Sequence, residues 1–198
     1  MAMPTLVVPA EGRGTLPFAL LHGRALLLHA VQTLRRLGPL TVTAGTDHLD
    51  EVRGMLGRER DVTVALADDF WAVGRPRVLV HDCLCPLAPE AWLRTVAGSA
   101  GPAVAVRPVT DTLKVVDGDT VGGTIDRGRF SIVTSPLLLV DVDGRPPTED
   151  PSALVTWMRG RGDVEILRAP QLARRVADSA SVSVMESVDA LRRELRED

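Results

Sequence analysis

The sequence is short of several residue types, and each shortage excludes a class of protein. Cys83 and Cys85 are the only cysteines, and they are too few and too close together to form a disulfide framework. A metal site on this pair would have only His81 as a nearby third ligand, so we favour two small buried residues beside a turn. The chain has no tyrosine and only 3% aromatic residues, which argues against a platform for stacked nucleic-acid bases.

The balance of charge and the absence of long apolar runs exclude further partners. The net charge is −3, and no basic stretch indicates binding to nucleic acid or to a membrane surface. No apolar run approaches the ~20 residues that a membrane span needs. The first residues carry neither a basic region nor a cleavable apolar stretch. We therefore expect a cytoplasmic protein with no nucleic-acid partner and no membrane partner.

What the chain does contain is enough apolar material for a sizeable core. Of its 198 residues, 45% are hydrophobic and 25% are charged, which is typical of a globular protein. The length predicts a single domain over residues 1–198. Lys114 is the only lysine, so arginine carries almost all of the positive charge, with a different shape and hydration from an ammonium group.

Short apolar runs bounded by turn residues alternate with stretches of helical character. We expect strands at residues 5–9, 40–44, 62–66, 77–80, 103–106, 130–134, 137–142 and 164–167, the run at 137–142 being also compatible with a helix. We expect helices at residues 25–37, 89–97, 151–161 and 187–197, and one that Asp47 caps and that ends near residue 56. The alternation predicts an α/β fold with a doubly wound, mostly parallel sheet. Residues 67–76 are few for a crossover between parallel strands.

The strand at residues 77–80 ends on His81 and Asp82, and the rest of the chain is organised around it. In an open α/β sheet, ligands bind beyond the carboxyl ends of the strands. A carboxylate at that position can hold Mg²⁺ against the phosphates of a nucleotide, because Mg²⁺ prefers hard oxygen ligands and shares them with phosphate. The alternative is that Asp82 caps the next helix or accepts hydrogen bonds in the turn.

The first strand is followed by a turn that contains Ala10, Gly12, Arg13 and Gly14. Glycines after a strand let backbone N–H groups approach an anion, which makes Ala10, Gly12 and Gly14 candidates for nucleotide binding. The spacing matches neither the P-loop nor the dinucleotide-binding pattern, so a plain connection between strand and helix is the alternative.

Residues 108–127 alternate between apolar and polar side chains around a turn at residues 117–119. This pattern predicts a β-hairpin that projects from the sheet as an arm. An exposed hairpin has unpaired edges that a partner would cover. We therefore expect the arm to hold two copies of the chain together as a homodimer.

Five segments together resemble one known family over nearly the whole chain. They are VVPA at residues 7–10 with its glycine turn, LHAV at 28–31, VLVHD at 78–82, PVTDTLK at 108–114 and TIDR at 124–127. The family is that of the methylerythritol-phosphate cytidylyltransferases of the non-mevalonate isoprenoid pathway. The resemblance implies a Rossmann-like nucleotidyltransferase fold, dimerisation through the arm and Mg²⁺ as cofactor. It also implies a reaction that joins the cytidylyl group of CTP to a sugar-alcohol phosphate and releases pyrophosphate.

The resemblance also implies roles for individual residues. Asp82 would hold the metal, and Arg13 is a second catalytic candidate because it could replace a missing cation. Threonine hydroxyls and an arginine fork suit a phosphate by geometry and charge. The residues expected at the acceptor and its phosphate, some of them from the partner's arm, are Thr112, Lys114, Arg127, Thr134 and Thr148. Alternatively, Arg127 pairs with Asp126 or Asp111, and Lys114 only solvates the arm.

The chain departs from the family where cations are expected. Phe18 follows Pro17 where the family has a Pro-Lys pair, Ser183 precedes Val184 where a second lysine is expected, and Cys85 replaces an arginine. Because each preorganised donor in such a site is worth about 10²–10³-fold in rate, we expect an eroded nucleotide site with weak or no turnover. The alternative is a non-catalytic, dimeric relative that binds a phosphorylated small molecule or a protein partner.

Overall fold

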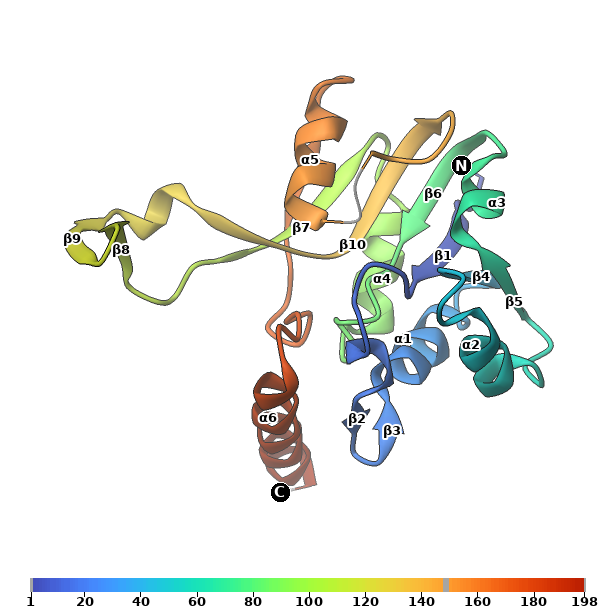
Figure 1. The fold of residues 1–198 in the computed structure, drawn as a ribbon, viewed down its shortest axis with the longest axis horizontal. Coiled ribbons are helices and arrows are strands. Elements are labelled where there is room, and N and C mark those ends of the chain that lie inside the picture. Colours follow the sequence, from blue (N-terminus) through green and yellow to red (C-terminus); the bar gives the residue numbers. More distant parts are fainter. Residues whose placement is uncertain (1, 148–149, 198) are drawn as a thin grey trace.

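The structure is a computed structural model that describes residues 2–147 and 150–197, with side chains described as far as residue 191. Its centre is a seven-stranded sheet in the order β11-β7-β10-β6-β1-β4-β5 (Figure 1). The strands are β1 (Thr5–Pro9), β4 (Leu40–Ala44), β5 (Val62–Leu66), β6 (Arg75–Val80), β7 (Ala103–Pro108), β10 (Ser131–Val142) and β11 (Glu165–Arg168). Four of the six neighbouring pairs are parallel, and only β10 runs against its neighbours. The expected doubly wound, mostly parallel sheet is confirmed.

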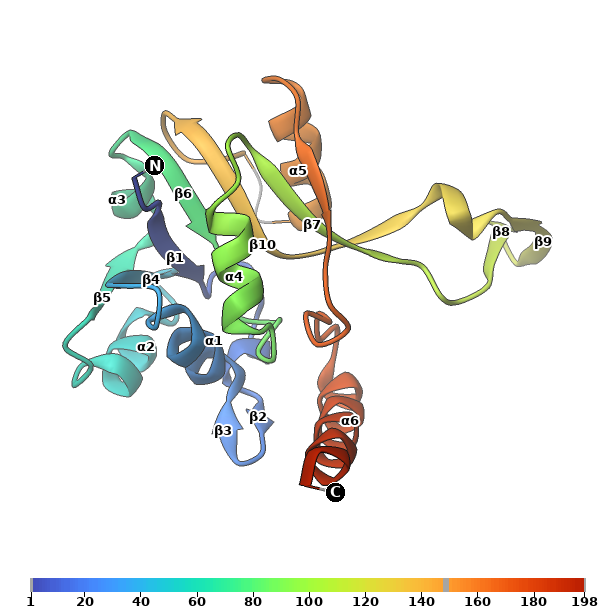
Figure 2. The same cartoon turned by 180° about the vertical axis from the view of Figure 1, so that it is seen from behind.

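Helices cover both faces of this sheet, because alternate residues of each strand point to opposite sides. Leu6 and Val8 of β1 pack with α1 (Leu26–Leu34), α2 (Leu49–Leu56), α4 (Glu90–Ala97) and the start of α6 (Ser179–Glu197). Val7, between them, packs on the other face with α3 (Ala67–Trp71) and α5 (Pro151–Arg159). Seen from behind, α4 lies in front of the sheet (Figure 2). A strand buried on both faces explains the continuous apolar run in its sequence.

Strand β10 joins two runs that the sequence suggests are separate. It pairs antiparallel with β7 and β6, and the register with β7 shifts between Val133 and Leu137. Pro136 lies in this interval and has no N–H for the ladder, so the pairing is interrupted there. The helical alternative for residues 137–142 is wrong, since they lie in β10. The interruption leaves Thr134 and Ser135, both buried, free to bond outside the ladder.

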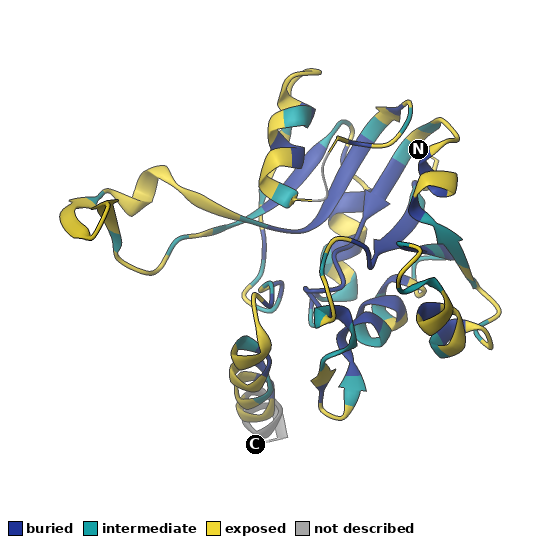
Figure 3. Cartoon of the chain, in the orientation of Figure 1, coloured by how far each residue is buried: buried dark blue, intermediate teal, exposed yellow. Residues whose placement is uncertain are grey.

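The arm consists of β8 (Leu113–Asp117) and β9 (Thr120–Ile125), which pair only with each other. It extends far from the sheet (Figure 1), and nearly all of it is exposed (Figure 3). Val116 and Val121, paired across the hairpin, are 65% and 67% exposed. The 3₁₀ turn Arg127–Arg129 leads from the arm back into β10.

Several boundaries differ from those expected. Helix α1 ends at Leu34 rather than at residue 37, and His48 rather than Asp47 is the N-cap of α2. The short connection at residues 67–76 contains α3. Helix α6 begins at Ser179, eight residues earlier than expected, and lies beside a small hairpin of β2 (Leu20–Leu21) and β3 (Arg24–Ala25). Within the part of the chain that the structure describes, no helix is long and apolar enough to cross a membrane.

Candidate functional site

The candidate site lies where β1 and β6 end side by side. The two strands are parallel neighbours, so their carboxyl ends meet at one edge of the sheet. His81 continues the ladder by donating its N–H to the Val7 carbonyl at 2.9 Å. The turn after Pro9 and the carboxylate of Asp82 therefore face each other, as the sequence predicts for a strand-end site.

Asp82 is clamped between two arginines. Arg13 Nε donates to Oδ1 at 2.9 Å, and Arg175 Nε donates to Oδ2 at 2.8 Å. The Leu84 N–H also donates to Oδ1, at 3.0 Å, which is the turn hydrogen bond that the sequence left open as an alternative. Burial alone would raise the pKa of Asp82, but attraction to Arg13 and then to Arg175 outweighs it and holds the pKa at about 2. Both carboxylate oxygens are thus bonded, and the group is ionised.

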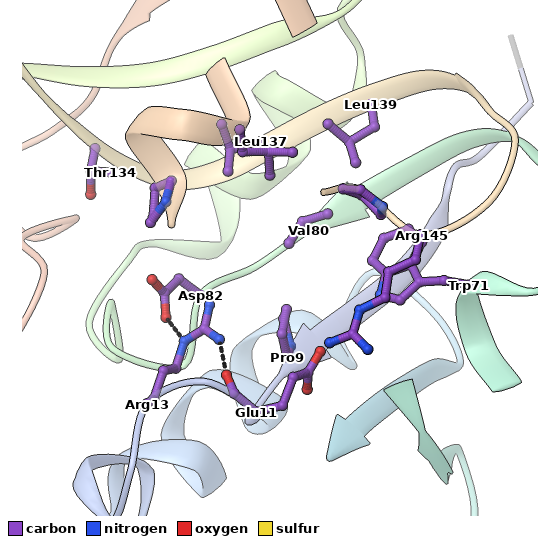
Figure 4. Close-up of a pocket in the computed structure, with 13 residues that line it drawn as sticks. Pro9, Glu11, Arg13, Trp71, Val80, Asp82, Thr134, Leu137, Leu139 and Arg145 are labelled. Atoms are coloured by element: carbon purple, nitrogen blue, oxygen red, sulfur yellow. Dashed lines mark hydrogen bonds and ion pairs between the residues drawn. The ribbon is translucent and has the colours of Figure 1, made fainter. Parts of the chain in front are cut away.

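Arg13 reaches Asp82 from the glycine turn (Figure 4). Gly12 and Gly14 flank it with φ values of 70° and 54°, in a region that side chains with a Cβ disfavour. Its side chain is only 5% exposed and also donates to the Glu11 carbonyl at 2.6 Å. Burial alone would lower the pKa of Arg13, but attraction to Asp82 outweighs it and raises the pKa. The two glycines therefore fold a cation inward onto a carboxylate of the same chain.

The carboxylate of Glu11 occupies the same turn. Thr43 Oγ1 donates to its two oxygens at 3.0 and 2.9 Å, and the Ala10 N–H lies 3.1 Å from Oε2. The Ala10 N–H also donates to the Thr43 carbonyl at 2.8 Å. Glu11 is 7% exposed, so a buried negative charge stands where the sequence predicts that a nucleotide phosphate could bind. Ala10 as a nucleotide-binding residue stays a prediction, although its N–H is already bonded.

Hydrogen bonds to Ser135 of β10 fix the end of β6. Ser135 Oγ accepts the Asp82 N–H at 2.9 Å and lies 2.7 Å from His81 Nδ1. Burial lowers the pKa of His81 to about 4, with Asp82 opposing the shift, so the ring is neutral at ordinary pH. Trp92 Nε1 donates to the Ser135 carbonyl at 3.1 Å. The interrupted segment of β10 thereby holds Asp82 in place.

The segment that carries Arg174 and Arg175 is anchored at both ends. Thr134 Oγ1 donates to the Ala173 carbonyl, and the Val176 N–H donates to the Leu84 carbonyl at 2.7 Å. Ala173 and Val176 are fully buried. The backbone on either side of the two arginines is therefore fixed to β10 and to the turn after β6.

Two cavities share Thr134 in their linings, and they differ in size and character; Asp82 lines the first, and its partner Arg175 lines the second. The first has a volume of about 40 Å³ and an apolar wall that includes Trp71, Val80 and Leu137, with Glu11 and Arg145 at its polar side (Figure 4). The second has a volume of about 350 Å³. It is lined by Arg107, Pro108, Thr110, Asp111, Ile132, Thr134, Arg174, Arg175 and Ala177. We call them the apolar cavity and the arginine cavity.

The structure brings only some of the expected residues to this site. Asp82, Arg13 and Thr134 lie together, whereas Thr112, Lys114 and Arg127 are exposed on the arm or at its base. Lys114 Nζ donates to Thr124 Oγ1 at 2.8 Å within the hairpin. Arg127 donates to the Thr110 carbonyl, while Asp126 accepts the Gly128 N–H. The expected Thr148 lies outside the described residues.

The resemblance leads us to expect a lysine where Ser183 stands, but the cation beside Asp82 comes from another position. Ser183 is an exposed residue of α6, and Met185 packs into the core. Arg175, followed by Val176, reaches Asp82 instead. Phe18 packs at the edge of the core with its ring centroid 5.2 Å from that of His48, and Cys85 is buried with its Sγ 3.4 Å from Thr134 Oγ1. The sequence signal that could have identified Arg175 is a basic residue followed by a valine. This Arg175-Val176 pair lies eight residues before the Ser183-Val184 pair that we compared with the family.

The residues present do not fit Mg²⁺ in this arrangement. Asp82 offers no free carboxylate oxygen, and two guanidinium groups beside it would repel a divalent cation. In the described part of the chain, no group of three or more His, Cys, Asp or Glu residues is placed to hold a metal. A metal on Asp82 stays a prediction that would require one arginine to leave.

The fold and the strand-end site define a nucleotidyltransferase-like α/β protein, and solved structures agree. A 2-C-methyl-D-erythritol 4-phosphate cytidylyltransferase from Thermus thermophilus matches 96% of this chain and all of its own, with a TM-score of 0.73 and 20% identity. The 4-diphosphocytidyl-2C-methyl-D-erythritol synthase of Anaerococcus prevotii matches 94% of this chain and 97% of its own, with a TM-score of 0.72 and 15% identity. At such identities the likeness shows the fold alone.

Sequence relatives give the particular family. A 2-C-methyl-D-erythritol 4-phosphate cytidylyltransferase from Saccharopolyspora erythraea is 36% identical over 161 residues, which cover 66% of this chain and 71% of the relative. Its namesake from Streptomyces avermitilis is 31% identical over 172 residues, which cover 68% and 69%. The chain belongs to the 2-C-methyl-D-erythritol 4-phosphate cytidylyltransferase family, which confirms the resemblance read from its motifs. No family model matches it.

Proposed function

We propose that this chain binds a phosphorylated small molecule in the arginine cavity and transfers the cytidylyl group of CTP weakly or not at all. One observation carries the proposal: both oxygens of Asp82 are bonded to arginines. The carboxylate on which a metal–nucleotide complex would depend is neutralised by side chains of the same chain.

The arginine cavity, where the acceptor substrate would lie, supports binding of a phosphate. The arginine cavity has three guanidinium groups and a volume of about 350 Å³, within the ~300–1,000 Å³ that is usual for small-molecule sites. Guanidinium groups bind phosphate oxygens through charge-assisted, often paired hydrogen bonds. Thr134 contributes by holding the Ala173 carbonyl, so it positions the neighbouring arginines in addition to lining the cavity.

The glycine turn around Arg13 and Glu11, where a nucleotide would bind, supports low turnover. Transfer of a cytidylyl group requires positive charge around the α-phosphorus and the departing pyrophosphate, because catalysis of phosphorus transfer is mainly positioning and charge stabilisation. Here the guanidinium of Arg13 is buried against Asp82, and the carboxylate of Glu11 fills the glycine turn. A triphosphate would have to displace Arg13 from its partner and overcome repulsion from Glu11.

The arm supports a homodimer. Val115, Val116 and Val121 are about half to two-thirds exposed on an isolated two-stranded hairpin, which is marginally stable on its own. A second copy would cover these side chains and the hairpin edges. In such a dimer, the partner's Thr112 and Arg127 could reach the acceptor phosphate, as the family resemblance implies.

An active cytidylyltransferase that uses CTP, a sugar-alcohol phosphate and Mg²⁺ is the second candidate. The observation that favours it is the presence of Arg13 and Arg175 at the strand end, where the sequence had suggested a loss of cations. In this case Asp82 would exchange an arginine for the metal when the nucleotide binds, and the released guanidinium would be free for phosphate.

Pyrophosphate release from CTP, Mg²⁺ and methylerythritol phosphate separates the two candidates. We expect a rate at least about 100-fold below that of the Thermus thermophilus relative measured in parallel, since one lost donor alone costs about that much. Asp82→Asn is the control, because any residual rate that survives this change does not come from the site. A rate near that of the relative would overturn the proposal and establish the second candidate.

A further inference from the structure

Arg107 and Arg174 bring two like charges to one cavity. Both line the arginine cavity, Arg107 from the end of β7 and Arg174 from the segment anchored at Ala173 and Val176. Among the described residues, neither is ion-paired with a carboxylate, whereas Arg13 and Arg175 share Asp82. Partial burial lowers the pKa of Arg107, and the nearby charge of Arg174 lowers it further.

The position of this pair is built into the fold. Thr134 and Leu84 fix the backbone on both sides of Arg174, as described above. Asp82 holds the Nε of Arg175 and leaves the two terminal nitrogens of that guanidinium without a bond to Asp82. Two like charges held together in a cavity repel each other, and an anion bound between them relieves the repulsion. Because the backbone that carries Arg174 is already fixed, little ordering of the main chain would oppose binding.

We propose that the ligand of the arginine cavity is a hydroxylated small molecule with two anionic groups, one of them a phosphate. This inference rests on the proposed function, with the phosphate held by Arg175 of the cavity together with the partner's Arg127 and Thr112. Arg107 and Arg174 then remain for a second anionic group, a carboxylate or another phosphate. Thr110 and Asp111 on the same wall suit hydroxyl groups, since a carboxylate accepts hydrogen bonds and repels a further anion.

A matched pair of ligands tests the second charge. Glycerol 3-phosphate and 3-phosphoglycerate differ in one position, where the latter has a carboxylate in place of a hydroxymethyl group. Titration calorimetry of the full chain, without nucleotide or metal, is expected to show about tenfold tighter binding of 3-phosphoglycerate, as for one charge-assisted hydrogen bond at a partly exposed site. Arg107→Gln and the exposed Arg174→Gln should each remove most of this preference. Arg58→Gln, an exposed arginine in the loop before β5, removes the same charge elsewhere and should leave the preference intact.

The outcomes separate this inference from the proposed function. Equal affinity for the two ligands would overturn the second anionic group and leave phosphate binding in place. A preference that survives both Arg107→Gln and Arg174→Gln would show that the pair does not cause it, which also overturns the inference. If neither ligand binds, the inference and the acceptor half of the proposed function are overturned together. If Arg107→Gln does not fold, Arg174→Gln gives the answer alone.

Discussion

The apolar cavity and the arginine cavity share Thr134 but have opposite character. On the first side, of about 40 Å³, Arg13 is only 5% exposed and Glu11 is bonded to Thr43, so the charges are satisfied within the chain. On the second side, of about 350 Å³, Arg107 and Arg174 have no carboxylate partner among the described residues. The difference teaches that a count of cations does not locate a binding site. What matters is whether their charge is already neutralised.

Asp82→Asn is expected to have the largest effect, because it removes the charge on which both sides depend. It leaves the guanidinium of Arg13 buried without a counter-ion, and breaking a buried pair in this way costs about 3 kcal/mol of unfolding free energy. Urea denaturation measures the loss. Asp68→Asn is the control, since Asp68 pairs with Arg145 but is 82% exposed, and it should cost less than about 1 kcal/mol. Equal losses in the two variants would contradict the buried clamp.

Acid titration should give the next largest effect. The pKa of Asp82 is about 2 in the folded chain and has an ordinary value of 3.8, so the folded state resists protonation of this group. Its contribution of about 2 kcal/mol is complete above pH ~4 and is lost as the pH falls through about 2. We expect the stability difference between the native chain and Asp82→Asn to shrink over that window. A difference that stays constant from pH 4 to pH 2 would show that the pKa is not depressed.

Thr134→Val should have a smaller effect on stability and a specific effect on the arginine cavity. The change removes the hydroxyl that donates to the buried Ala173 carbonyl, at a cost of about 1 kcal/mol. It also loosens the segment that carries Arg174, so affinity for glycerol 3-phosphate should fall. Thr95→Val, which removes an exposed hydroxyl bonded to the Ala91 carbonyl in α4, is the control. Unchanged affinity in Thr134→Val would mean that the anchor does not position the arginines.

Deletion of residues 115–121 should disturb the folded body least. These residues pair only within the arm, so the circular dichroism of the rest of the chain should persist. We expect the sedimentation mass to fall from a dimer to a monomer, and binding of glycerol 3-phosphate to weaken because the partner's Arg127 no longer reaches the cavity. Val116→Asp makes a milder test, since it places a charge on the exposed face of the hairpin. An unchanged mass in both variants would remove the arm from the dimer interface.

The sequence predicts the strands well because their signal is local. Apolar runs bounded by turn residues locate β1, β4 and β5 at the expected residues, and the position of Asp82 at the end of β6 follows from the same pattern. The arm is equally visible, since its turn and its alternation lie within twenty residues. These features depend on neighbours along the chain and need no knowledge of the tertiary structure.

The charges around Asp82 could not be assigned in this way. Arg175 lies 93 positions from Asp82. Its approach depends on two hydrogen bonds that no periodicity encodes, one donated by Thr134 to the Ala173 carbonyl and one accepted by the Leu84 carbonyl from the Val176 N–H. Glu11 adopts its role only because β4 lies beside β1 and presents Thr43. The sequence therefore predicts which residue types surround the strand end, while tertiary packing determines which of them neutralise one another.

Calorimetric titration of the chain with CTP and Mg²⁺ tests most directly whether the charges around Arg13, Asp82 and Glu11 prevent binding of the nucleotide. With the charges of Arg13, Asp82 and Glu11 satisfied internally, we predict no saturable binding with a dissociation constant below about 1 mM, while glycerol 3-phosphate binds the same sample. A micromolar dissociation constant for CTP in the presence of Mg²⁺ would contradict this account.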